Sequence, residues 1–154
     1  MPLKLHTPLP PLDGATEWIT SPPDFKSLTE APLLVYFWAL SCHICHANLP
    51  KIQSLREEYA PKGLEVISIH CPRMKADVNV EKVRQVVEKH EFNEPVGIDN
   101  KHKVKKTFDN DYWPAYFLFD DKGSLKCRAA GQNGLSVVEP IITVSYTHLT
   151  LPTN

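Results

Sequence analysis

Two cysteines separated by two residues, Cys42 and Cys45, are the side chains of this sequence best suited to do chemistry. The apolar run 32–39 precedes them, and apolar residues at helical spacing follow at Leu49, Ile52, Leu55 and Tyr59. The spacing therefore predicts a strand, then a helix that begins at the first cysteine. A helix N-terminus carries free N–H groups and a partial positive charge, and both stabilise a thiolate. Because the thiolate is the attacking species in disulfide exchange, we expect Cys42, facing solvent, to attack and the buried Cys45 to resolve.

The pattern of the remaining residues predicts an α/β fold that positions the two cysteines. Apolar runs bounded by Gly, Pro and Asp indicate strands, and apolar residues at helical spacing indicate helices between them. The expected strands are 33–39, 64–70, 95–99, 115–119 and 125–129, and the expected helices are 42–59, 80–90, 101–108 and one from about 135. Alternation of strand and helix predicts parallel strands covered by helices, and the hairpin at 120–123 adds an antiparallel edge.

The two ends of the chain differ in composition from its middle. Residues 1–31 hold six of the fourteen prolines, which favours an extended segment that packs on the domain formed by residues 32–143. Residues 144–154 are rich in β-branched side chains and contain Pro152, so we expect them not to continue the last helix. They also resemble a translated adapter sequence, and we interpret them as a non-native tail.

Composition excludes several classes of function. The chain has 154 residues, 42% of them hydrophobic, as expected for one globular domain. Its 17 Lys and Arg residues nearly balance 18 Asp and Glu, so no strong field predicts binding to nucleic acid or to a membrane. The first residues lack the apolar core of a secretory signal, so we expect a cytoplasmic protein. In that reducing compartment Cys71 and Cys127 are expected to be structural thiols.

Taken together, these motifs resemble those of the thioredoxin superfamily, in the redoxin-like branch of bacterial thiol–disulfide oxidoreductases. The resemblance covers about residues 9–143 and predicts a thioredoxin-like fold: a central mixed sheet flanked by helices, with a helical insertion at 80–90. Four features in order carry it: Phe37-Trp38-Ala39 before the cysteines, Pro50 after them, Trp113-Pro114 before an apolar strand, and Gly131 after the last strand.

The resemblance implies a site and a reaction. Pro114 is expected to be cis and to expose a backbone edge to substrate, and Trp113, Ser41 and His43 are expected to border the same substrate-binding surface. The implied activity is disulfide exchange with protein substrates, without a cofactor or metal. The expected cytoplasmic location favours reduction of those substrates by a monomer, with electrons from an upstream thiol reductant. As a cation, His43 favours the Cys42 thiolate and a more oxidising potential.

One departure from the family concerns proton transfer. Many thioredoxins carry a buried acid six residues before the first cysteine, and this sequence has Tyr36 there. Glu58, Asp77 and His70 are alternative proton acceptors, which the sequence does not rank.

Three other functions fit parts of the pattern. Cys42-His43-Ile44-Cys45-His46 matches the signature for covalent haem attachment. Cys42, Cys45 and His46 with His70 or Cys71 offer zinc ligands, although structural zinc usually has a second close pair. A redox-inactive binding module on the same fold is the third alternative.

Overall fold

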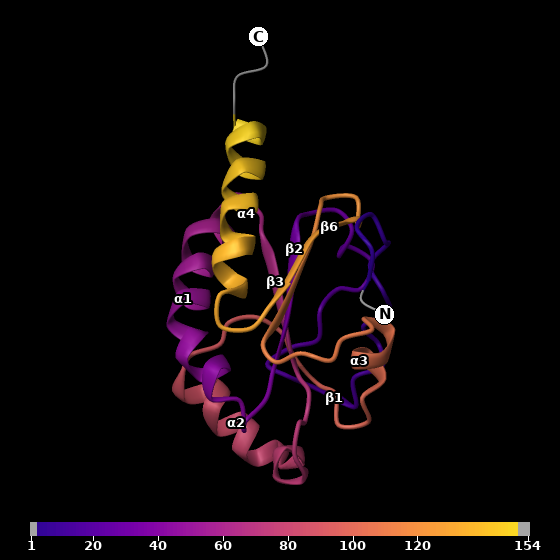
Figure 1. Ribbon diagram of the computed structural model, residues 1–154, viewed down its shortest axis with the longest axis vertical. Helices are drawn as coiled ribbons and strands as arrows, with labels where there is room; N and C mark the ends of the chain where they lie inside the picture. Colours follow the sequence, from indigo (N-terminus) through magenta and orange to yellow (C-terminus); the bar gives the residue numbers. More distant parts are fainter. Residues whose placement is uncertain (1–2, 151–154) are drawn as a thin grey trace.

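The computed structural model describes residues 3–150, with 144–150 described by their backbone alone. Its centre is a six-stranded mixed sheet in the order β1-β4-β3-β2-β5-β6 (Figure 1). The strands are β1 Glu17–Ile19, β2 Leu33–Trp38, β3 Glu65–His70, β4 Val96–Ile98, β5 Ala115–Phe119 and β6 Leu125–Ala130. The helices are α1 His43–Tyr59, α2 Val80–Lys89, α3 Lys103–Thr107 and α4 Gly134–Thr150, with short 3-10 helices η1 Ala60–Lys62 and η2 Lys75–Val78. The predicted mixed sheet flanked by helices is confirmed.

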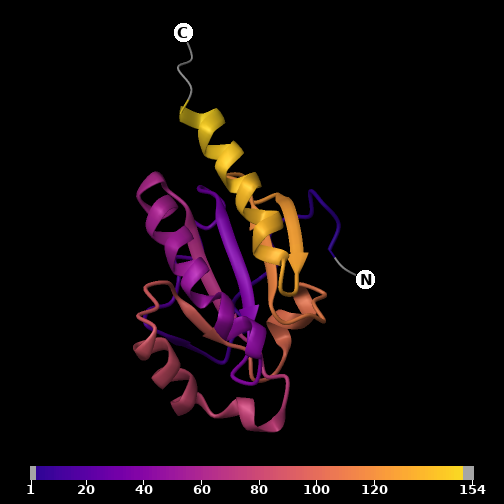
Figure 2. The same ribbon diagram turned by 60° about the vertical axis from the view of Figure 1, so that its left-hand side comes forward.

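Strand direction determines which loops meet. β2 is parallel to β3 and antiparallel to β5, and β3 is parallel to β4. The end of β2 therefore lies beside the end of β3 and the start of β5. Figure 2 shows that the η2–α2 segment, the predicted insertion, lies at this same end of the sheet, where β2 leads into α1.

The sheet separates two hydrophobic clusters, and all six residues of β2 are buried between them. In Figure 1, α1 and α4 lie on one side of the sheet, and α3 lies on the other side with the N-terminal segment. Alternate β2 residues contribute to each cluster, as the two-residue period of a strand requires. Leu12 and Leu28, which precede β2, are buried in the α3-side cluster. Among residues 3–150, no helix has both the length and the apolar character needed to cross a bilayer.

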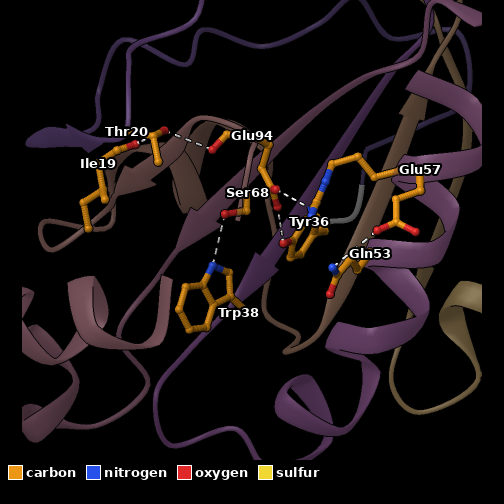
Figure 3. A network of polar contacts seen from close by, with 9 residues as sticks. Ile19, Thr20, Tyr36, Trp38, Gln53, Glu57, Ser68 and Glu94 are labelled. Atoms are coloured by element: carbon orange, nitrogen blue, oxygen red, sulfur yellow. Dashed lines mark hydrogen bonds and ion pairs between the residues drawn. The ribbon is translucent and has the colours of Figure 1, made fainter. Parts of the chain in front are cut away.

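A polar network is buried between α1 and the sheet (Figure 3). The Tyr36 hydroxyl donates a hydrogen bond to Glu94 Oε2 at 2.6 Å, and Trp38 Nε1 donates to Ser68 Oγ at 3.2 Å. Arg56 Nη1 donates to the other carboxylate oxygen of Glu94 at 2.5 Å. Burial, reinforced by the neighbouring Glu94 charge, raises the pKa of Tyr36 well above its usual value, so the phenol stays neutral.

Two features of the chain ends differ from the sequence predictions. β1 was not predicted: residues 17–19 pair antiparallel with β4, so the proline-rich segment contributes an edge strand. The prediction that the last helix ends near residue 144 is wrong, because α4 runs to Thr150. β-branched residues cost a helix at most about 0.7 kcal/mol each, which a helix already nucleated on the sheet tolerates. The division of the chain at residues 31 and 143 and the non-native origin of its tail stay predictions, and residues 151–154 lie outside the described residues.

The buried ion pair provides a test of the core. Replacing Arg56 with alanine leaves the Glu94 side chain, 1% exposed, without its cation. We expect the free energy of unfolding in urea to fall by roughly 3–5 kcal/mol, the usual cost of an uncompensated buried charge. Arg84→Ala is the matched control, because it breaks an ion pair with Glu17 in which both side chains are more than 40% exposed. That control should lose less than about 1 kcal/mol. Equal losses in the two variants would contradict this assignment.

Candidate active site

Cys42 and Cys45 form a disulfide at the start of α1, with their Cα atoms 5.2 Å apart. Cys42 is the N-cap residue of the helix, in extended conformation, and its Sγ accepts a hydrogen bond from the Cys45 N–H at 3.1 Å. The predicted placement of the first cysteine on a helix N-terminus is confirmed. The expectation that it faces solvent is wrong, because Cys42 is 1% exposed and Cys45 is 2% exposed. The capping bond turns the Cys42 sulfur back over the first turn of the helix.

The backbone just before Cys42 is held by two histidines from different elements. His70, the last residue of β3, accepts the Leu40 N–H through Nε2 at 3.1 Å. His46, in the first turn of α1, contacts the Leu40 carbonyl oxygen through Nε2 at 2.9 Å. Both imidazoles lie edge-to-face with the Trp38 indole, at ring separations of 4.8 Å for His70 and 6.2 Å for His46. The peptide groups on both sides of Leu40 are thereby fixed.

The next residue, Ser41, is held by Asp77 of η2. The Ser41 N–H donates to Asp77 Oδ1 at 3.0 Å and its hydroxyl donates to Oδ2 at 2.7 Å. The same carboxylate accepts the N–H groups of Arg73 and Met74, at 2.9 and 3.0 Å. Burial alone would raise the pKa of Asp77, but the hydrogen bonds from Ser41, Arg73 and Met74 outweigh it and the pKa lies below its usual value. Asp77 is therefore a buried anion next to the residue that precedes Cys42.

His70 is fully buried, and burial lowers its pKa from 6.5 to about 4 against the opposing attraction of Asp77. The neutral ring fits its contacts, since Nε2 accepts the Leu40 N–H and the proton must then reside on Nδ1. Within the described part of the chain, that Nδ1 is buried with no hydrogen-bond partner.

The Trp113–Pro114 peptide bond is cis, which confirms the sequence prediction. Pro114 is buried and Trp113 is half-buried, packing against both hydrophobic clusters. The indole N–H donates to the Cys71 carbonyl oxygen at 2.8 Å, and the Cys71 N–H donates to the Trp38 carbonyl oxygen at 2.8 Å. These bonds join the segment before β5 to the ends of β2 and β3.

The other two cysteines behave as the sequence predicted. Cys71 and Cys127 are free and buried. Burial raises the pKa of both thiols, and Asp99 raises that of Cys71 further. A buried thiol of raised pKa is a poor nucleophile, so both cysteines are structural.

The structure brings together some of the predicted side chains and separates others. Ser41 is half-buried beside Cys42, and His43 is exposed at the first position of α1. Of the three alternative proton acceptors, His70 and Asp77 reach the segment before Cys42. Glu58 is exposed near the far end of α1, about 20 Å along the helix from Cys45. Sequence reasoning missed the contact of His46 with Leu40; its only signal was the position of His46 in the first turn of the helix.

The ligands proposed for zinc or haem have other partners. The two sulfurs are bonded to each other, and His46 and His70 both contact the Leu40 backbone. Over the described part of the chain, no three His, Cys, Asp or Glu side chains are grouped so that they could hold a metal ion.

Comparison with known proteins agrees with this geometry. The model of the AhpC/TSA family matches residues 14–128. The thiol-disulfide oxidoreductase YkuV of Bacillus subtilis is 33% identical over 138 residues, 89% of this chain and 93% of that protein. The thiol-disulfide oxidoreductase ResA of Bacillus cereus is 27% identical over 109 residues, 71% of this chain and 60% of that protein. The solution structure of a thioredoxin-like protein in its oxidised form superposes with a TM-score of 0.85 at 31% identity, covering 95% of this chain and 99% of the other.

A disulfide on the N-terminus of a helix, at the same end of the sheet as a cis-proline, defines a thioredoxin-like thiol–disulfide oxidoreductase. The family match spans most of the sequence. The chain belongs to the AhpC/TSA family.

The low pKa of His70 predicts how stability depends on pH. The unfolded chain binds a proton at His70 below pH 6.5, whereas the folded chain does so only near pH 4. The contribution of His70 is therefore fully present above pH 6.5 and is lost as pH falls toward 4. Between these limits, the free energy of unfolding of the wild type should fall by up to roughly 3 kcal/mol more than that of His70→Gln. Urea unfolding across this range measures the difference, and parallel pH profiles would contradict the assignment.

Proposed function

We propose that this protein reduces disulfide bonds in protein substrates through the Cys42/Cys45 dithiol. The observation that carries the proposal is the position of Cys42 Sγ on the first turn of α1, bonded to the Cys45 N–H. A thiolate formed there is stabilised by that N–H and by the partial positive charge of the helix end. Cys45 lies inside the first turn of α1, further from the helix end than the N-cap Cys42, which suits a thiol that attacks its neighbour.

The proposed reaction is two successive exchanges. The Cys42 thiolate attacks one sulfur of the substrate disulfide, forms a mixed disulfide and releases the first substrate thiolate, which takes up a proton. The Cys45 thiol then loses its proton and attacks Cys42 Sγ, and the second substrate sulfur leaves as a thiol. The substrate gains two electrons and two protons, and the protein is left with the Cys42–Cys45 disulfide. An upstream dithiol reductant returns it to the reduced form by the same chemistry in reverse.

The substrate is proposed to bind over the segments that surround the disulfide. Ser41, His43 and Trp113 supply the polar and aromatic parts of this surface, and the buried Pro114 is proposed to contribute a backbone edge. Exposed apolar side chains lie in the same segments: Ile44 between the cysteines, Met74 before η2 and Tyr112 before Trp113. Such a surface suits an extended peptide with apolar residues near its cysteine.

The setting of the reaction is also part of this proposal. The cytoplasm is proposed as its compartment, because a reductase needs surroundings that keep thiols reduced, and the protein is proposed to act as a monomer. In that compartment a dithiol protein maintained by a thiol reductant contributes to thiol redox homeostasis.

Serine substitution separates the roles of the two cysteines. Cys42→Ser should abolish turnover of a disulfide substrate, because the attacking thiolate is lost. Cys45→Ser should accumulate a mixed disulfide with substrate through Cys42, because the resolving thiol is missing. Non-reducing gels and intact-mass spectrometry measure both outcomes.

The two buried cysteines provide the matched controls. Cys71→Ser and Cys127→Ser remove thiols outside the disulfide and should retain turnover within about twofold of wild type, provided that the proteins fold. Full multiple turnover by Cys45→Ser would contradict the resolving role.

A further inference from the structure

Asp77 is the one charged side chain that binds the residue preceding the reactive cysteine in the described structure. It is 2% exposed, belongs to η2, and lies 35 residues after Cys42 in the chain. Both carboxylate oxygens are directed to Ser41, one to its N–H at 3.0 Å and one to its hydroxyl at 2.7 Å. The bond to the N–H constrains the backbone that leads directly into the N-cap position.

The groups that surround the Asp77 carboxylate do not neutralise its charge. Its four hydrogen-bond donors are neutral: the N–H and hydroxyl of Ser41 and the N–H groups of Arg73 and Met74. The nearby titratable side chain, His70 at the end of β3, is kept neutral by burial. A full negative charge therefore lies one residue away from Cys42, in a site from which water is largely excluded.

We propose that Asp77 is a positioning residue for the Cys42–Cys45 pair, and that its charge opposes the Cys42 thiolate and makes the disulfide more reducing. Like charges at short range disfavour one another, and the effect is stronger in a buried site than in water. Stabilising the thiolate form makes a disulfide more oxidising, so opposing it has the reverse effect. The inference rests on the proposed function, since it specifies how the same dithiol is adjusted toward reduction.

The test is a redox titration of the full-length protein in glutathione buffers, with alkylation and mass spectrometry to count thiols. In Asp77→Asn, which retains the shape but removes the charge, the pKa of Cys42 should fall by about one unit. The equilibrium constant for oxidation of the pair should fall about tenfold, which corresponds to a midpoint about 30 mV more oxidising. The thiolate absorbance of the reduced protein, followed against pH, measures the Cys42 titration independently.

Matched variants separate charge from hydrogen bonding. Ser41→Ala removes the hydroxyl bond to Asp77 but keeps the carboxylate charge, so it should not lower the pKa of Cys42. Asp120→Asn is the control for the substitution itself: Asp120 also accepts two backbone N–H groups in a turn, but at the opposite end of β5. It should leave the midpoint unchanged. Asp77→Ser supplies a second neutral variant, with the same expected shift, if the asparagine protein does not fold.

The outcomes distinguish the two proposals. If the wild-type pair shows no two-electron transition, the proposed function fails. If the wild type titrates normally but the Asp77 variants have the wild-type midpoint and Cys42 pKa, or a more reducing midpoint, then only the role of Asp77 is overturned. A shift of equal size in Ser41→Ala would assign the effect to the hydrogen bond and would also overturn the role of the charge.

Discussion

The site depends on the directions in which β2 pairs with its two neighbours. β3 runs parallel to β2, so both strands end at the same edge of the sheet, and β5 runs antiparallel, so it begins there. Three segments distant in sequence must therefore meet: the one that carries Cys42, the one between β3 and α2, and the one that contains Pro114. Among the bonds that join them, those of Trp38, Cys71 and Trp113 are backbone or indole contacts that do not titrate near neutral pH.

This constraint explains which parts of the site the sequence predicts. The cysteine pair, the cis-proline and their flanking strands are local patterns, in which a few neighbouring residues determine both conformation and chemistry. The hydrogen bonds that hold Leu40 and Ser41 are not local, because they require the register of β3 against β2 and the fold of η2. The sequence offers His70 and Asp77 as candidate proton acceptors but contains no signal that ranks them above Glu58. That ranking comes only from tertiary pairing.

The same reasoning applies to the elements that the sequence misjudged. β1 is three residues long in a proline-rich segment, and it is a strand only because the edge of β4 offers it partners. α4 continues through β-branched residues because propensity is a weak term once a helix has begun on a packed surface. In both cases the tertiary context outweighs the local preference, whereas β2, which is apolar throughout, was predicted without it.

Two of the buried carboxylates lie at opposite ends of α1, in different environments. At one end of α1, Glu94 is neutralised by Arg56 and bound by Tyr36, so its charge is compensated and its function is structural. At the other end, the donors that bind Asp77 in the described structure are neutral, so it keeps its charge beside the start of the helix. The helix N-terminus and this carboxylate act on Cys42 with opposite sign, and they belong to different segments of the chain. A change within the segment between β3 and α2 can therefore alter the redox balance of the pair without altering the four residues from Cys42 to Cys45.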